Sequence, residues 1–401
     1  MTINKPKICF FTGGRETGGM AFSSELLIRG INRDRFELIV LACTDGTFSH
    51  RMETIDQNCD ILGSGPPPLF RRDVGDCVKR CWAGYLKIPF WIFYTAFFLA
   101  KYIRNNKIDL VHSSYYHYHI VTALACKLTH CKCVLHWRGV CRYEKLLKIA
   151  KLIRRLTFSF VWSIPNSLAT FESIKQFTGD HITLVYNGLE IKELPRDSVR
   201  LREILGLDKK TNIVGLVATL LPLKGHIYFI EAAAKICAKY PDVHFVYIGG
   251  ETASGQKEYL ELLLTKIKQL NLENRVHFLG WRSDASELVA DFDIATVCTL
   301  PPGEGFGMVI IEAMARSVPV ITTNEGAAPE IITDGETGIL IPSADSDALA
   351  QAIEDILINE DKRKTLGSQG YRECLDRFDI KKTVKQVEQV YENVLSMSGK
   401  Q

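Results

Sequence analysis

The sequence predicts an α/β protein built from two doubly wound domains. A chain of 401 residues is longer than the chains that usually fold around a single hydrophobic core. Its hydrophobic content of 46% and charged content of 24% are typical of a globular protein. Short apolar runs are followed by glycine-containing turns and helical patterns in both halves of the chain, as in sheets assembled from βαβ units. We therefore expect parallel sheets covered by helices.

Six apolar or β-branched runs in the first half are expected to be strands. They are Lys7–Thr12, Phe36–Ala42, Asp109–His112, Val134–Gly139, Phe158–Ser163 and Ile182–Tyr186. A glycine loop follows the first run, and a helical pattern then extends from Met20 to Gly30, which is the opening βα unit of a doubly wound domain. Residues 63–80 begin with a Gly-Pro-rich break and are expected to form an irregular loop.

Two segments of the first half allow both a structural and a membrane interpretation. The aromatic run Phe90–Phe98 can be a buried helix of the α/β layer, or a helix whose apolar face lies in a membrane interface. The basic amphipathic segment Arg142–Arg155 can be a solvated outer helix, or a contact with anionic lipid.

Positive charge is concentrated in the first half. Residues 1–190 carry 25 Lys and Arg against 15 Asp and Glu, on a chain whose net charge is +3. This imbalance indicates an anionic partner. Because the chain shows no nucleic-acid-binding motif, we expect a membrane surface or an acidic acceptor, and no nucleic acid.

The cysteines and the N-terminus favour a cytoplasmic protein. The twelve cysteines follow no disulfide framework, and no hydrophobic leader follows the first residues. The longest apolar run, Ile88–Ala100, is too short to cross a bilayer. Cys126, Cys131, Cys133 and His130 lack the spacing of a zinc site, so no metal is expected. The basic half would allow a peripheral position on the inner face of the plasma membrane.

The second half repeats the alternation of strand, turn and helix. Expected strands are Asn212–Thr219, Val243–Ile248, Val276–Arg282, Asp293–Cys298 and Val318–Thr322, and expected helices are Pro195–Leu207, Ile227–Ala238, Tyr259–Leu270, Asp347–Leu357 and Lys381–Leu395. Ligands of such sheets lie beyond the carboxyl ends of the strands. The loops after these strands are therefore the expected site.

The most informative segment is Gly303-Glu-Gly-Phe-Gly-Met308, which leads into a helical pattern. Its glycines allow the backbone to turn sharply next to a ligand, and N–H groups at a helix start favour an anion such as a diphosphate. Glu304 and Glu312 cannot bind phosphate, but they can accept hydrogen bonds from sugar hydroxyls. Taken alone, this pattern also fits a plain turn with two structural carboxylates.

The surrounding sequence favours a ligand-binding loop over a plain turn. Glu304-Gly-Phe-Gly307, the second carboxylate Glu312, Ala327-Ala-Pro-Glu-Ile331 and Asp334-Gly-Glu-Thr-Gly338 resemble the C-terminal domain of family 4 retaining glycosyltransferases, over about residues 213–342. The resemblance implies the GT-B fold, with two Rossmann-like domains facing across a cleft. It implies an acceptor-side domain at residues 1–190, completed by a terminal helix at 380–398, and a nucleotide-sugar-binding domain at 191–379.

The resemblance also implies roles for individual residues. Glu304 would hold the hydroxyls of the donor sugar, Glu312 would hold those of the ribose, and Lys224 would neutralise the diphosphate. The remaining donor-binding candidates are loop residues near the phosphates or the nucleobase: Gly13, Gly14, Arg282, Gly305, Phe306, Gly307 and Met308.

Two positions depart from the family's pattern. The family's usual His-Gly pair is here Arg138-Gly139, with His136 two residues earlier, so either side chain could touch the donor sugar. Thr219 stands where the family commonly has an Arg that accompanies the lysine, and a threonine cannot supply that charge.

The resemblance implies transfer of a sugar, with retention, from a nucleotide-diphosphate donor of the UDP or GDP type. The acceptor would be a glycan or a lipid-linked molecule in polysaccharide, lipopolysaccharide or glycolipid synthesis, and neither metal nor other cofactor is implied. Thr219 and the displaced histidine favour an alternative, a weak or inactive member that serves as a nucleotide-sugar-binding scaffold. A nucleotide-sugar epimerase on the same framework is a second alternative.

Overall fold

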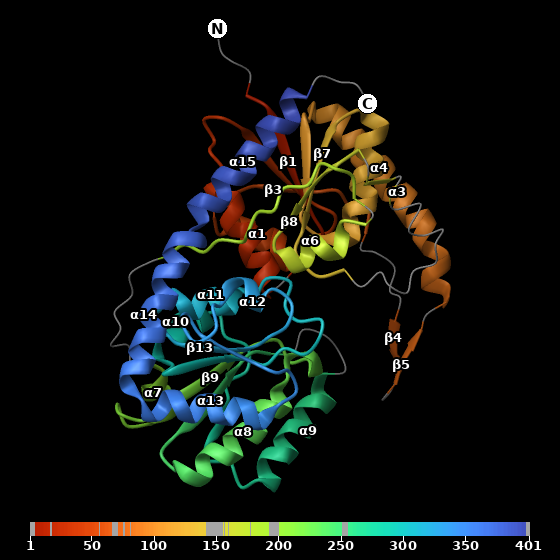
Figure 1. The fold of residues 1–401 in the computed structure, drawn as a ribbon. Helices are drawn as coiled ribbons and strands as arrows, with labels where there is room; N and C mark the ends of the chain where they lie inside the picture. The colour runs from red at the N-terminus through yellow and green to blue at the C-terminus, as the bar shows by residue number, and fades with distance from the viewer. Residues whose placement is uncertain are drawn as a thin grey trace. The chain divides into compact units, whose positions relative to one another are not determined.

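The computed structural model describes residues 5–397, apart from residues 17, 56, 66–70, 75–76, 81, 142–154, 156, 159, 177, 192–199 and 251–255. The chain divides into two compact units. Unit 1 comprises Met1–Gly188 and Ile380–Gln401, and unit 2 comprises Leu189–Asp379. Each unit contains a six-stranded parallel sheet with helices packed on it, so the expected fold class is confirmed (Figure 1).

The strands of unit 1 run in the order β3-β2-β1-β6-β7-β8. Their bounds are β1 (Lys7–Thr12), β2 (Glu37–Ala42), β3 (Cys59–Ile61), β6 (Leu110–Ser113), β7 (Lys132–Trp137) and β8 (Trp162–Pro165). The direction of strand succession reverses between β1 and β6. In doubly wound sheets this reversal, at the carboxyl ends of the strands, is where ligands bind.

Side chains that alternate along the strands of unit 1 form two cores, one on each face of the sheet. Phe11 and Leu135 pack with α3 and α4 on one face, whereas Phe10 and Val134 pack with α1 and α15 on the other. The helices are α1 (Gly18–Gly30), α2 (Thr47–Glu53), α3 (Trp82–Asn106), α4 (His119–Thr129), α6 (Leu168–Ile174) and α15 (Ile380–Ser396), with a 3-10 turn η1 (Tyr116–Tyr118).

The last helix, α15, is held in unit 1 by apolar and polar contacts. Val387 and Tyr391 are fully buried, and burial of such side chains stabilises a fold by about 1.5–3 kcal/mol each. The Glu388 carboxylate is also buried, and it accepts a hydrogen bond from the Asn32 backbone N–H at 2.7 Å and another from Arg35. The end of the chain therefore contributes to the core of the first unit.

The strands of unit 2 run in the order β11-β10-β9-β12-β13-β14. They are β9 (Ile213–Val217), β10 (His244–Ile248), β11 (Val276–Phe278), β12 (Ile294–Val297), β13 (Val320–Thr323) and β14 (Ile339–Ile341). The helices are α7 (Arg200–Leu205), α8 (His226–Lys239), α9 (Gln256–Gln269), α10 (Ala285–Leu288), α11 (Met308–Met314), α12 (Ala328–Ile331), α13 (Ser346–Ile358) and α14 (Glu360–Arg377), with 3-10 turns η2 (Pro222–Lys224) and η3 (Val289–Asp291). Strand succession reverses between β9 and β12.

Three local expectations were wrong. The loop expected at 63–80 contains an antiparallel pair, β4 (Arg71–Val74) and β5 (Cys77–Arg80), whose polar sequence shows no alternation. The strand expected at 158–163 is β8, because Phe158 lies in a helical turn and packs edge-on against Trp137. The strand expected at 182–186 is reduced to one bridge between Ser163 and Ile182.

The two segments that allow a membrane interpretation differ in how far the structure describes them. The basic segment 142–155 lies outside the described residues except for Arg155. The aromatic run is part of α3 and is buried on one face only: Trp91 packs in the core, whereas Phe90 is exposed. Among the described residues, no helix is both long and apolar enough to cross a membrane.

Candidate functional site

The candidate site in unit 2 lies at the reversal of strand order, where the loops after β9 and β12 meet. The loop after β9 ends in η2 and Lys224, and the Leu300 N–H of the loop after β12 donates to the Leu223 carbonyl at 2.8 Å. Gly225 joins η2 to α8 with φ of 70°, and a Cβ there would lie 2.0 Å from the Cys298 carbonyl oxygen. Only glycine therefore allows the Lys224 turn to approach the end of β12.

Lys224 and Glu304 meet across this junction. The Lys224 Nζ lies 2.5 Å from Glu304 Oε1, which also accepts a hydrogen bond from the Thr299 hydroxyl at 2.7 Å. Burial alone would raise the pKa of Glu304, but Lys224 and Thr299 outweigh it and hold this pKa below its ordinary value. Glu304 is therefore an ionised, oriented carboxylate.

The backbone of the glycine loop is fixed by a second loop. The Glu304 carbonyl accepts from the Ala327 N–H at 3.0 Å, and a Cβ on Gly303, whose φ is 80°, would lie 2.3 Å from the Gly326 nitrogen. Phe306 is buried with its ring edge-on to Phe378, and Gly305 precedes it. Gly307 then caps α11, whose first residue is the buried Met308. The loop is thus anchored at both ends before the helix begins.

Glu312 lies on α11 in an environment that disfavours its charge. Burial raises the pKa of this carboxyl to about 7, although Arg316 one turn later acts in the opposite direction. The Arg316 Nε and Nη1 atoms are buried without a hydrogen-bond partner among the described residues. A buried carboxyl whose pKa is raised in this way is typical of a functional site.

Of the other two candidates of unit 2, Thr219 is bonded through its backbone and Arg282 through its side chain. Thr219 follows β9, and its carbonyl accepts from the Leu221 N–H at 2.8 Å. Arg282 follows β11 and donates to both carboxylate oxygens of Asp284, at 2.8 and 2.9 Å. Asp284 also pairs with Arg200 at 2.6 Å.

In unit 1, the backbone amides of Gly13 and Gly14 bind a carboxylate of the same chain. The buried Glu16 side chain accepts from the Gly13 N–H at 2.5 Å, from the Gly14 N–H at 2.8 Å and from the Thr12 hydroxyl at 2.6 Å. The loop after β1 therefore forms an anion-binding nest that is filled from within. The sequence analysis missed Glu16, although an acidic residue inside a glycine loop is a visible signal.

Two buried histidines occupy the carboxyl ends of β6 and β7. The His136 Nδ1 lies 3.3 Å from His112 Nε2, and the His112 Nδ1 lies 2.8 Å from the hydroxyl of Tyr391 on α15. Burial, together with the Arg138 charge, holds the pKa of both imidazoles well below the ordinary value. If Tyr391 donates to His112 and His112 donates to His136, the His136 Nε2 carries a proton, and this atom has no partner among the described residues.

Arg138 lies next to His136 but is held by unit 1. Its Nη1 donates to Ser23 at 2.7 Å and to Asn187 at 2.8 Å, and its Nη2 lies 3.3 Å from His136 Nδ1. The two side chains therefore lie side by side at the end of β7. Burial lowers the pKa of this guanidinium to about 9.

The structure therefore pairs Lys224 with Glu304 and His136 with Arg138. The sequence analysis missed the positioning partners of these residues, Thr299, His112 and Tyr391. The two-residue period of neighbouring strands could have indicated His112. Nothing in the local sequence indicated Tyr391, which is 279 residues away from His112 along the chain.

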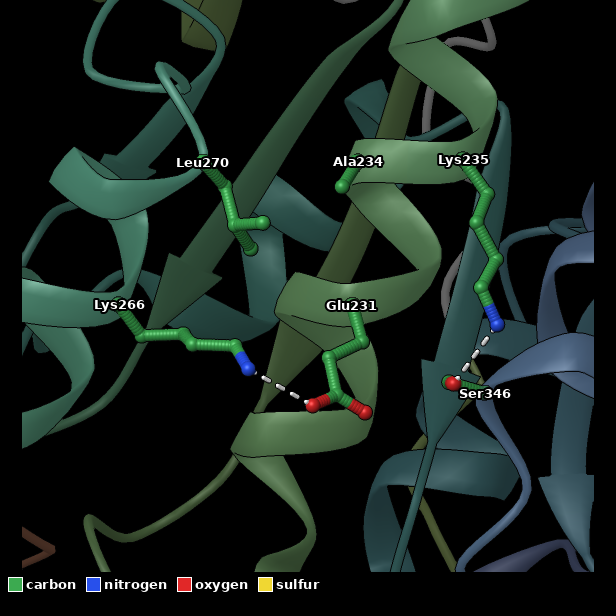
Figure 2. A pocket seen from close by; sticks show the side chains of 6 residues that line it. All are labelled: Glu231, Ala234, Lys235, Lys266, Leu270 and Ser346. Carbon is green, nitrogen blue, oxygen red and sulfur yellow. Dashed lines mark hydrogen bonds and ion pairs between the residues drawn. The ribbon is translucent and has the colours of Figure 1, made fainter.

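A depression of about 340 Å³ on unit 2 lies apart from these loops (Figure 2). It is lined by side chains of α8 and α9, by the residue directly after α9 and by the first residue of α13: Glu231, Ala234, Lys235, Lys266, Leu270 and Ser346. Its polar groups bind one another, since Lys266 pairs with Glu231 at 3.0 Å and Lys235 donates to Ser346 at 3.0 Å.

Comparison with known proteins identifies the family. The sequence profile described as Glycosyltransferase Family 4 matches residues 17–193, and the profile described as Glycosyl transferases group 1 matches residues 197–373. The chain belongs to glycosyltransferase family 4. The resemblance seen in the Glu304 loop is thereby confirmed.

Curated members of family 4 match about half of the chain. Over 244 residues, it is 29% identical to D-inositol 3-phosphate glycosyltransferase of Corynebacterium urealyticum, covering 58% of this chain and 57% of that protein. N-acetyl-alpha-D-glucosaminyl L-malate synthase of Bacillus anthracis is 30% identical over 215 residues, covering 53% of this chain and 54% of that protein. The chain thus spans about half the length of these relatives.

Solved structures of glycosyltransferases match nearly the whole chain. HepE of Anabaena, in complex with UDP and glucose, is 26% identical with a TM-score of 0.79, covering 96% of this chain and 99% of that one. A glycosyltransferase of Rickettsia africae has a TM-score of 0.82 at 20% identity, covering 98% of this chain and all (100%) of the other, and supports the fold alone. The family 4 chain therefore has the two-domain, Rossmann-like GT-B fold.

Proposed function

We propose that this chain transfers a sugar from a nucleotide-diphosphate donor to a glycan or lipid-linked acceptor, with retention of anomeric configuration. The observation that carries the proposal is the Lys224–Glu304 pair, held at 2.5 Å at the reversal of strand order in unit 2. One loop supplies a cation for phosphate, and the other supplies an ionised acceptor for sugar hydroxyls. Family membership supports the reaction class.

A UDP-sugar is the donor that we favour, because HepE was solved with UDP and with UDP-glucose. In the proposed reaction the bond between the anomeric carbon and the β-phosphate oxygen breaks, and a bond to the acceptor oxygen forms on the same face. The acceptor's proton goes to the departing phosphate. Lys224 and the amides near residues 305–308 would stabilise the developing negative charge, so no metal ion is required by the proposal.

The other residues take roles that follow from their surroundings. Glu304 would hold the donor sugar and Glu312 the ribose hydroxyls. His136 is the better candidate for a sugar contact in unit 1, since its Nε2 lacks a partner in the described part of the chain, whereas Arg138 is bound to Ser23 and Asn187. Unit 1 would be the acceptor-side domain and unit 2 the nucleotide-sugar-binding domain.

The acceptor proposal rests on charge. The excess of ten positive charges over residues 1–190 supports an acidic glycan or a lipid-linked acceptor, and a position at the cytoplasmic face of an anionic membrane. Such an acceptor belongs to polysaccharide, lipopolysaccharide or glycolipid synthesis.

The first experiment is thermal unfolding with UDP, GDP, ADP, CMP or no ligand. A nucleotide present at about 100 times its Kd stabilises a protein by about 2.7 kcal/mol, so we expect one clear responder, UDP. The matching UDP-sugars would then be screened for transfer with wild type, Glu304→Ala and the exposed control Glu273→Ala. Full transfer by Glu304→Ala would refute the assignment.

Thr219 supports a second candidate, a nucleotide-sugar-binding scaffold with little turnover. The threonine supplies no charge beside Lys224, and the other cationic candidate of unit 2, Arg282, is paired with Asp284. A UDP response without transfer to any acceptor, and without release of free or epimerised sugar, would favour this candidate.

A further inference from the structure

Helix α3 presents a continuous row of aromatic side chains to solvent. Phe90, Phe93, Tyr94 and Phe97, here called the aromatic stripe, are 73%, 67%, 42% and 64% exposed. Their spacing of three and four residues places them on one side of the helix, opposite the buried Leu99. Phe90 stacks on Tyr94 with ring centroids 5.9 Å apart, so the rings form one surface.

Basic residues stand at both ends of the stripe. Lys87 precedes it by one turn, and Lys101 and Arg104 follow it at the same helical spacing, all three exposed. The helix contains no Asp or Glu between Trp82 and Asn106. Among the described residues, Asp60 accepts a hydrogen bond from Tyr102 of this helix, and Tyr102 lies to one side of the stripe.

This distribution distinguishes a lipid surface from a protein partner. Aromatic rings flanked by long cationic side chains match a bilayer interface, where rings enter at the depth of the headgroups and lysines extend to the phosphates. A second copy of the chain would bring the cations of two α3 helices together, which costs Coulomb energy.

We propose that the aromatic stripe docks unit 1 on an anionic lipid bilayer, with the α3 axis parallel to the membrane plane. The basic residues at its two ends contact lipid phosphates. Figure 1 shows α3 beside α4 in unit 1, and the exposed stripe lies on the side of α3 that is not packed in the core. The proposal deepens the membrane partner suggested above by naming the element that makes the contact, and it does not depend on glycosyl transfer.

The test is flotation of the full chain with vesicles of phosphatidylcholine, with and without phosphatidylglycerol, at low and physiological salt. Wild type should float with the anionic vesicles, more strongly at low salt. The variant Phe90→Ser/Phe93→Ser/Phe97→Ser should lower the partition coefficient by at least about 30-fold. Lys87→Gln/Lys101→Gln should lower it by about 5-fold per lysine at low salt and by less at high salt.

The matched control changes exposed apolar residues of another helix. Leu262 and Leu264 on α9 are 53% and 46% exposed, so Leu262→Ser/Leu264→Ser should bind vesicles like wild type. The UDP-induced thermal shift of every variant reports on folding and on the donor site. Absence of wild-type flotation, equal flotation of the phenylalanine variant, or a wild-type dimer that this variant abolishes would each overturn the proposal.

Discussion

Glu312 should destabilise the free protein at neutral and alkaline pH. Burial raises the pKa of this carboxyl from an ordinary 4.5 to about 7, so the folded state binds the proton more tightly than the unfolded state does. Stability is therefore complete below the unfolded pKa and falls as pH rises through about 7. At about 1.4 kcal/mol per pH unit, the whole difference corresponds to about 3 kcal/mol.

The variant Glu312→Gln keeps the shape of the protonated side chain and removes the charge. Because part of the Glu312 side chain reaches solvent, we expect a gain of about 1–2 kcal/mol at pH 8.5, or about 3–6 °C in the melting temperature of unit 2. At pH 5, where only a small part of the charge effect remains, the gain should be much smaller than at pH 8.5. The exposed Glu273→Gln is the control, and its effect should be small at both values of pH.

Thermal unfolding followed by circular dichroism measures this difference directly. The reasoning is refuted if Glu312→Gln is no more stable than wild type at pH 8.5, or if it gains as much at pH 5. In the first case, hydrogen bonds or charges other than those described here would stabilise the ionised Glu312 carboxylate. In the second case packing rather than charge would explain the gain.

Three further predictions concern the same groups. UDP affinity should fall several-fold as pH drops from 7.5 to 6, because protonation near pH 7 removes the acceptor at Glu312, and calorimetry should show that Glu312→Gln lacks this dependence. Thr299→Val should lower kcat about 10-fold and leave the Kd for UDP unchanged, because its hydroxyl orients Glu304; a weakened UDP complex would contradict this role. Tyr391→Phe should destabilise unit 1 by about 1–2 kcal/mol in urea unfolding, since His112 loses a buried hydrogen bond, and an unchanged midpoint would show that the contact is neutral.

The sequence predicted the parts of the fold that follow from local pattern. Buried parallel strands such as Ile213–Val217 are near-continuous apolar runs, and α15 has a regular apolar face. Helix α14 was not predicted, because its mostly polar sequence buries few side chains, among them Leu366 and Cys374. Its stability comes from packing on α11, which periodicity does not reveal.

The site residues that could be predicted are those that lie in a recognisable loop motif. Glu304 and Lys224 were identified separately from their loops, and the reversal of strand order explains why they meet. In unit 1 the two positioning contacts differ in this respect. Glu16 fills the nest at Gly13 from three residues away, so local spacing could have indicated it. Tyr391 reaches His112 from the other end of the chain, and local spacing could not have indicated that contact.

Because α15 packs on the first unit, the folding of the N-terminal half depends on residues that are synthesised last. The apolar layer of unit 1 that receives Val387 and Tyr391 is translated first, and all of unit 2 must be made before its cover emerges from the ribosome. A nascent or truncated chain that ends before Ile380 would expose this layer and leave the Arg35 side chain without its Glu388 partner. Shortening the C-terminus should therefore cause aggregation through the N-terminal half, although no residue of that half is altered.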